Sequence, residues 1–291
     1  MTSRVKTPKP AAPMIARIAS SLSSRVRPLR ALLRGAAVLV GLSVLPTAVL
    51  AYADLLPEGF DLAILGFESS PAMDLPHVRE QLAAGGPLRI VAFGSSSTEG
   101  VGASSPAAAY PARLQAALNR ALPHLVGGVS VLNRGIGGEH VDDMMRRLER
   151  DVIAAKPQLV IWQTGSNDPL RGIDLDHFRE ATLTGLRAMR EAGIDVVLME
   201  PQWCPKFDAT PGSYRFRDAV REIGEETGVP VIRRSELMRS WINEARLTRK
   251  ELFAPDGLHM ADRGYALLAR AAADEILRDA GGPVRVAEAA Q

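Results

Sequence analysis

The sequence predicts an α/β fold in which one parallel sheet is covered by helices on both faces. Short apolar runs, rich in β-branched residues, alternate along the chain with longer segments whose apolar residues recur at helical spacing. Some of these runs, such as residues 159–162, contain no charged side chain, which is typical of strands buried on both faces. Strands that alternate with helices are joined by crossover connections, and such connections produce parallel pairing.

Five apolar runs are the expected strands. Residues 88–93 (LRIVAF) end at a glycine, residues 129–132 precede Asn133, and residues 159–162 (LVIW) form another buried run. Residues 195–199 (DVVLM) and 229–232 complete the set. All are too short for buried helices and are bounded by turn-forming residues, which favours strands.

The segments between and after these runs are the expected helices. They are residues 110–122, 141–153, 176–191, 214–227, 236–245 and 261–278, with a short helix near residues 77–84. Residues 141–153 are amphipathic because Met144, Met145, Leu148 and Val152 lie on one helical face. Gly193 follows residues 176–191, where a glycine is expected to terminate the helix.

The domain organisation follows from this alternation and from the chain length of 291 residues. We expect an export signal or membrane anchor over residues 1–53 and a lead-in segment over residues 54–85. One folded domain is expected over residues 86–280, followed by a mobile tail over residues 281–291. No internal repeat or second domain is evident in the sequence.

The N-terminal segment predicts export. Residues 1–53 hold eight Lys or Arg and no Asp or Glu, and residues 35–53 carry no charge at all. Ala51 and Ala53, just before Asp54, are the small residues that a signal peptidase requires. The apolar stretch is also just long enough to span a bilayer, so residues 35–53 could instead remain as a membrane tether. Either alternative leads to an exported domain, periplasmic or secreted, with the basic end in the cytoplasm.

Charge and cysteine content narrow the function classes. The net charge is +2, so subtracting the eight N-terminal charges leaves the rest of the chain near −6. That balance and the absence of a DNA- or RNA-binding motif argue against a nucleic-acid partner. Cys204 is the only cysteine, which excludes an intramolecular disulfide, and an inert buried thiol is expected there.

Three short segments carry the residue types of an ester-hydrolysing site. Residues 94–98 (GSSST) offer hydroxyl nucleophiles on a turn, and residues 165–168 (GSND) offer an amide donor on another turn. Residues 256–259 (DGLH) place an acid and a base three residues apart. A serine needs a neighbouring base to become nucleophilic, and a developing oxyanion needs fixed N–H donors. The first two segments follow expected strands, so the topology brings them to the same edge of the sheet.

Together with residues 133–139 (NRGIGGE), these segments resemble the sequence blocks of the GDSL, or SGNH, hydrolases over residues 88–270. The resemblance implies that Ser96 is the nucleophile, with Ser95 in place of the usual Asp of G-D-S-x-T. It implies oxyanion donors at the main chain of Ser96, the main chain of Gly138 and the side chain of Asn167. Gly135 and Gly137 are less favoured alternatives to Gly138.

In the same family pattern, D-x-x-H corresponds to Asp256 and His259. The resemblance makes His259 the general base and Asp256 the group that orients its ring. Asp168 is expected to be structural, capping a helix or bracing the loop, rather than to react. The implied fold is a flavodoxin-like, three-layer α/β/α sheet, and the implied chemistry is the metal-independent hydrolysis of acyl esters.

No cofactor or metal is expected. Glu139 and His140 are adjacent, but no H-E-x-x-H pattern or closed ligand set accompanies them. Phe207, Trp203 and Tyr214 are candidates either for lining a substrate groove or for ordinary packing.

The favoured function is an exported serine esterase acting on acyl esters, with short acetyl groups on a glycan or a small molecule as the expected substrate. Two alternatives remain open. One is a carbohydrate-binding or acetyl-transfer module in the modification of surface polysaccharides, and the other is a lipase or thioesterase acting on longer acyl chains.

Overall fold

The computed structural model describes residues 75–279. The predicted export segment, residues 54–74 of the lead-in and the predicted tail lie outside the described residues. Within residues 75–279, no helix combines the length and the apolar character that crossing a bilayer requires.

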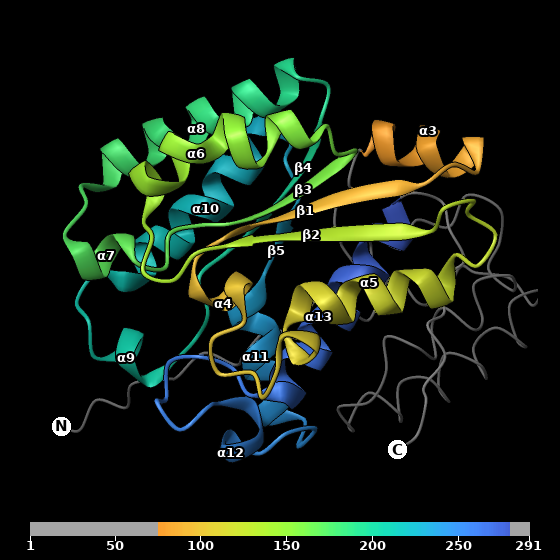
Figure 1. The fold of residues 1–291 in the computed structure, drawn as a ribbon. Coiled ribbons are helices and arrows are strands. Elements are labelled where there is room, and N and C mark those ends of the chain that lie inside the picture. Colours follow the sequence, from red (N-terminus) through yellow and green to blue (C-terminus); the bar gives the residue numbers. More distant parts are fainter. Residues whose placement is uncertain (1–74, 280–291) are drawn as a thin grey trace, which may run out of the picture. The chain divides into compact units, whose positions relative to one another are not determined.

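A five-stranded parallel sheet forms the centre of the described domain (Figure 1). Its strands are β1 (Leu88–Gly94), β2 (Val129–Gly135), β3 (Leu159–Gln163), β4 (Asp195–Met199) and β5 (Val231–Ile232). They lie side by side in the order β2-β1-β3-β4-β5, and every pairing is parallel. The predicted α/β class and parallel sheet are therefore confirmed.

Helices cover both faces of the sheet and give the three expected layers (Figure 1). One face carries α6 (Val141–Asp151), α8 (Leu175–Glu191) and α10 (Ser213–Thr227). The opposite face carries α5 (Tyr110–Ala121), α11 (Arg234–Asn243) and α13 (Asp262–Asp279). The two apolar cores share the sheet between them, which buries nearly all of its central side chains.

Alternation along β1 shows how one strand supplies both cores. Ile90 and Ala92 pack into the core on the α5 and α13 side, whereas Val91 and Phe93 pack into the core on the α6 side. Successive strand side chains point to opposite faces, so an apolar strand with helices on both sides is fully buried.

A short helix, α3 (Pro76–Ala84), adds the predicted lead-in helix to the same domain. Leu75 and Val78 are fully buried in the core that contains α5 and α13. The main-chain N–H of Val78 donates to the Asp195 carboxylate over 2.9 Å, which ties α3 to the start of β4. Residues 75–85 thus pack as part of the folded domain.

The remaining helices are single turns that connect the main elements. They are α4 (Ser96–Glu99), α7 (Asp168–Arg171), α9 (Pro205–Asp208), α12 (Arg249–Leu252) and the 3₁₀ turns η4 (Pro106–Ala108) and η5 (Ile153–Ala155). Four of these turns follow strands or precede α13 at the edge of the sheet where β1 ends. That edge also contains the three candidate motifs.

β1 and β3 each extend one residue beyond the expected strand, and larger differences from the sequence expectation occur at β2 and β5. β2 continues through the polar residues Asn133 and Arg134, because it is an edge strand that stays paired with β1 up to the Gly94–Gly135 position. β5 begins at Val231 rather than at residue 229, since Pro230 has no N–H to donate to a neighbouring strand.

Candidate active site

The turn between β1 and α4 presents Ser96. Gly94 ends β1, and a Cβ at that position would lie 2.4 Å from Thr98 Oγ1 and 2.8 Å from Gln163 Oε1. Only glycine therefore leaves room for the Thr98 and Gln163 side chains that pack against residue 94. Ser95 and Ser97 are buried, whereas Ser96 is partly exposed. Of the three consecutive serines, the middle one is therefore the most accessible.

Ser96, His259 and Asp256 form a continuous hydrogen-bonded chain. Ser96 Oγ lies 2.8 Å from His259 Nε2, although the two residues are 163 positions apart in sequence. His259 Nδ1 lies 2.6 Å from Asp256 Oδ2. When Nδ1 carries the proton, it donates to Asp256, and Nε2 accepts the hydrogen bond from the Ser96 hydroxyl. The structure thus brings together the nucleophile, base and acid named from sequence.

A local turn holds the acid against the base. Asp256 Oδ1 accepts the main-chain N–H groups of Leu258 and His259, each over 3.0 Å. Gly257 adopts a left-handed φ of 62°, which lets the chain curl around the carboxylate. The other oxygen, Oδ2, is then directed at the imidazole. A spacing of three residues is therefore sufficient for this pair.

The Asp256 carboxyl group stays ionised in this setting. Partial burial by itself would raise its pKa, but hydrogen bonds from the His259 ring and from two main-chain N–H groups lower the pKa to about 2. An ionised carboxylate stabilises an imidazolium, and His259 would become an imidazolium on taking the Ser96 proton.

The glycine loop that follows β2 lies beside the nucleophile. A Cβ on Gly137 would be 3.8 Å from Ser96 Cβ and 2.9 Å from a carboxylate oxygen of Glu99. Gly138 adopts a left-handed φ of 79°. Within residues 75–279, neither the main-chain N–H of Ser96 nor that of Gly138 donates a hydrogen bond to another main-chain group. Both N–H groups are therefore available to a ligand.

Asn167 reaches the same loop from the end of β3. Its side-chain Nδ2 donates to the main-chain carbonyl of Glu139 over 2.8 Å. Asn167 immediately precedes α7, and Glu139 directly follows Gly138 in the chain. The predicted donors at residues 138 and 167 are thus brought together by one hydrogen bond.

Asp168 braces the site, as its expected structural role requires. It is fully buried, and its Oδ1 accepts the main-chain N–H of Val141 at the start of α6 over 2.9 Å. Burial raises its pKa to about 6, although the hydrogen bond from Val141 acts in the opposite direction.

Gln163 is a site residue that sequence reasoning missed. Its Oε1 accepts the main-chain N–H of Ser95 over 3.0 Å and lies 3.1 Å from the Ser95 hydroxyl. Its Nε2 donates to Ser166 Oγ over 3.0 Å, which links the Ser96 turn to the Asn167 turn. Gln163 thus braces the turn in which Ser95 stands where the family pattern has Asp. A polar last residue in an otherwise apolar strand was the available signal.

The other candidates from sequence pack in the core. Trp203, Phe207 and Cys204 are buried in the core on the α5 and α13 side, and Tyr214 packs against its edge. Burial raises the pKa of the Cys204 thiol, which disfavours the nucleophilic thiolate. In the part of the chain that the structure describes, no group of three or more His, Cys, Asp or Glu side chains is placed to hold a metal ion.

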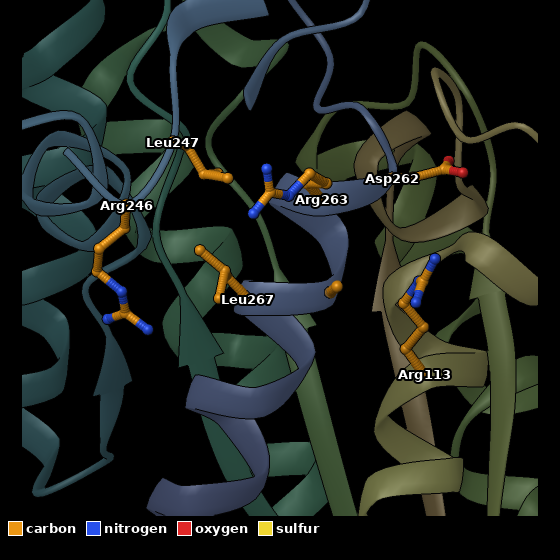
Figure 2. A pocket seen from close by; sticks show the side chains of 7 residues that line it. Arg113, Arg246, Leu247, Asp262, Arg263 and Leu267 are labelled. Atoms are coloured by element: carbon orange, nitrogen blue, oxygen red, sulfur yellow. The ribbon is translucent and has the colours of Figure 1, made fainter. Parts of the chain in front are cut away.

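A cavity of about 370 Å³ lies beside the first turns of α13 (Figure 2). Its lining residues are Arg113, Arg246, Leu247, Asp262, Arg263, Ala266 and Leu267. Arg113 and Arg246 lie on opposite sides of the helix in Figure 2, so their guanidinium groups do not converge on one point. Since the lining includes none of Ser96, Asp256 and His259, this cavity does not mark the candidate active site.

Comparisons with known proteins agree with this geometry. The model of the non-GDSL lipase-like family matches residues 68–281. The chain is 29% identical over 180 residues to an acetylxylan esterase of Geobacillus stearothermophilus, covering 57% of this chain and 80% of that protein. It is 24% identical over 210 residues to the uncharacterized lipoprotein YqeF of Bacillus subtilis (strain 168), covering 62% and 85% respectively.

The fold has matches among solved structures. A lipolytic protein of the G-D-S-L family from Desulfitobacterium hafniense DCB-2 superposes with a TM-score of 0.54 at 21% identity, covering 64% of this chain and 98% of that one. With the family match spanning most of the chain, the chain belongs to the non-GDSL lipase-like family within the SGNH/GDSL hydrolases, and it is a carboxylic ester hydrolase.

Proposed function

We propose that this protein is an exported serine esterase that removes short acyl groups, acetyl above all, from a glycan or a small ester. The observation that carries this proposal is the chain of hydrogen bonds from Ser96 Oγ through His259 to Asp256, of 2.8 Å and 2.6 Å. These are the distances over which a base can take a serine proton during attack.

The proposed reaction passes through an acyl-enzyme. Ser96 Oγ forms a bond to the ester carbonyl carbon while His259 Nε2 takes the hydroxyl proton. The N–H groups of Ser96 and Gly138 and the amide of Asn167 stabilise the resulting oxyanion. The intermediate then expels the alcohol, which receives the proton from His259. Water, activated by His259, next hydrolyses the acyl-enzyme and regenerates Ser96.

The proposed substrate class and the proposed export are supported by the relatives of this chain and by its N-terminal sequence. The acetylxylan esterase of Geobacillus stearothermophilus is a relative of this chain, which favours an acetylated glycan. Export is supported by the uncharged segment 35–53 behind a basic N-terminus and by the relationship to a lipoprotein.

A kinetic series on p-nitrophenyl esters of increasing acyl length, run beside acetylated glycans, tests the proposal. We expect the highest kcat/KM on acetyl esters, release of acetate from an acetylated glycan, and loss of both activities in Ser96→Ala. A preference for long acyl chains would support the lipase or thioesterase alternative instead. Glycan binding without turnover, or transfer of acetyl to a sugar in place of water, would support the binding or acetyl-transfer alternative.

The metal-independent mechanism has its own test. Activity should be unchanged after treatment with EDTA, because the proposed steps use only side chains and main-chain N–H groups. Strong inhibition by the chelator, reversed by added divalent metal, would contradict the mechanism.

A further inference from the structure

We propose that Arg147 is a positioning residue for the oxyanion-binding loop, acting through Glu139 on the donors at Gly138 and Asn167. The inference rests on the proposed function, since it concerns the same reaction. Arg147 lies on α6, outside all of the sequence blocks that name the catalytic residues, and its side chain is 5% exposed.

The guanidinium of Arg147 joins the ends of two strands. Its Nη2 donates to the main-chain carbonyl of Gly94 over 3.1 Å, and its Nη1 donates to the carbonyl of Arg134 over 3.0 Å. Gly94 is the last residue of β1 and precedes the turn of Ser96, while Arg134 lies at the end of β2. The Gly94 carbonyl also accepts the N–H of Ile136 over 3.1 Å. The start of the glycine loop and the start of the Ser96 turn are therefore fixed to one group.

The same guanidinium holds the far end of the glycine loop. Nε and Nη2 both donate to Glu139 Oε2, over 2.8 Å and 2.5 Å. The main-chain carbonyl of Glu139 in turn accepts Asn167 Nδ2 over 2.8 Å. Arg147 thus holds the side chain of Glu139, and the main-chain carbonyl of Glu139 holds the side chain of Asn167. Both residues 138 and 167 depend on where residue 139 lies.

The setting of Arg147 requires a guanidinium. Its Cζ lies 4.5 Å from the centroid of the Phe93 ring, which is fully buried, so the planar group is stacked in place. Three nitrogen atoms reach acceptors on residues 94, 134 and 139 at the same time. A lysine ammonium is a compact charge and cannot span acceptors spread along a planar fork.

The position of these contacts distinguishes Arg147 from the neighbouring arginine on the same helix. Arg150 forms an ion pair with Asp151 over 2.7 Å and its side chain is 72% exposed. Arg147 also contacts Asp151, over 3.1 Å. Arg150→Gln therefore removes an arginine and an Asp151 contact from α6 without touching the loop, and it serves as the matched control.

The test compares Arg147→Lys and Arg147→Gln with Arg150→Gln in the full chain. Kinetics are measured on p-nitrophenyl acetate, and the rate of inactivation by a fluorophosphonate probe is measured at a temperature where circular dichroism shows every variant folded. We expect both Arg147 variants to lose kcat by about 10²-fold, the effect of losing about one oxyanion donor. KM should change by less than about threefold, because the loss falls on the transition state. Inactivation by the probe should slow in parallel, and Arg150→Gln should match the wild type.

Glu139→Gln provides a second variant should the Arg147 variants fail to fold. It keeps the main-chain carbonyl that Asn167 uses but weakens the contact with Arg147, so kcat should fall in the same direction by a smaller factor. Folded Arg147 variants with wild-type kcat, or an unchanged Glu139→Gln enzyme, would overturn the inference. If Ser96→Ala is inactive while the Arg147 variants are normal, only the positioning role fails. If Ser96→Ala retains activity, the proposed function itself fails.

Discussion

The side-chain amide of Asn167 donates a hydrogen bond of 2.8 Å to the main-chain carbonyl of Glu139. An amide nitrogen carries two hydrogens, so this contact uses one and leaves the other for a ligand. The contact also fixes the orientation of the side chain, since reversing the amide would place two oxygens against each other. Asn167 is therefore oriented before any substrate arrives, which is the property expected of an oxyanion donor.

Replacing Asn167 should reduce turnover more than binding. We expect Asn167→Ala to lower kcat by about 10²–10³-fold with little change in KM, since one donor to the oxyanion is lost. Asn167→Asp should lose at least as much, because its carboxylate would repel both the Glu139 carbonyl and the oxyanion. Steady-state kinetics on p-nitrophenyl acetate measure both effects. Equal kcat values for wild type and Asn167→Ala would remove Asn167 from the oxyanion hole.

Alanine substitutions at the glycines of the loop should affect stability and activity to different extents. A Cβ on Gly135 would lie 2.0 Å from the main-chain nitrogen of Glu99, so Gly135→Ala should prevent folding or lower the melting temperature strongly. Gly138 has a φ of 79°, and a Cβ there would meet only Arg171 Nη2 at 3.4 Å. Gly138→Ala should therefore cost only about 1 kcal/mol of stability.

Gly138→Ala should lower the activity far more than its small loss of stability would explain. The left-handed backbone at residue 138 aims its N–H, and a shift of the loop would misdirect the proposed donor. Thermal unfolding and kinetics of the same preparations provide the comparison. A Gly138→Ala enzyme with full activity would point to another N–H of the loop as the donor.

Gln163 should matter for both folding and turnover. Gln163→Leu has a similar size but leaves the buried N–H of Ser95 without its acceptor, whereas the Ser166 hydroxyl keeps its hydrogen bond to Gln202. Each unsatisfied buried group costs about 1–3 kcal/mol, so we expect a marked loss in the free energy of unfolding by urea. Ser95→Ala removes only one hydroxyl and keeps the main-chain bond to Gln163, so its loss should be smaller. The reverse order of stability would contradict the bracing role of Gln163.

The raised pKa of the buried Asp168 carboxyl group predicts how the stability of the folded domain changes with pH. Burial raises its folded-state pKa to about 6, whereas its ordinary value is 3.8. Between these values the folded state binds more protons than the unfolded state, so stability is lost as pH rises through this window. A difference of about two units corresponds to at most about 3 kcal/mol.

Asp168→Asn tests this dependence because its amide oxygen can still accept the N–H of Val141. Urea unfolding of both proteins at pH 4 and pH 7 measures the difference. From pH 4 to pH 7, the free energy of unfolding of Asp168→Asn should rise by about 2–3 kcal/mol relative to that of the wild type. Parallel stability profiles for the two proteins would show that Asp168 does not bury an ionised carboxylate at pH 7.

The sequence predicted much of the fold because the strands of a covered parallel sheet are apolar runs. Residues 195–199 were assigned correctly, and the main helices were placed to within a few residues. The single-turn helices, such as α4 and α9, were not assigned, because four residues are too few to show a helical period. The end of β2 was not predicted either, since Asn133 and Arg134 are polar residues on an edge strand.

Site residues in the short blocks were predictable, whereas the residues that support them were not. Ser96, Asp256 and His259 follow from short patterns at the expected edge of the sheet, and the structure brings the three side chains together. Gln163 contacts a turn 68 residues away, and Arg147 contacts a carbonyl 53 residues away. The polar end of an apolar strand marks Gln163 as unusual but does not name its partners, and no local pattern marks Arg147, because these partners are set by strand order and helix packing.

The most direct test of the central claim is to locate the covalent adduct of a fluorophosphonate probe by peptide mass spectrometry. The wild type should carry one adduct, on Ser96, because this hydroxyl lies 2.8 Å from His259 Nε2 and is positioned to lose its proton to the ring. Ser95→Ala and Ser97→Ala should be labelled at Ser96, while Ser96→Ala and His259→Ala should not be labelled appreciably. An adduct on Ser95, Ser97 or another serine, or full labelling of Ser96→Ala, would contradict the account.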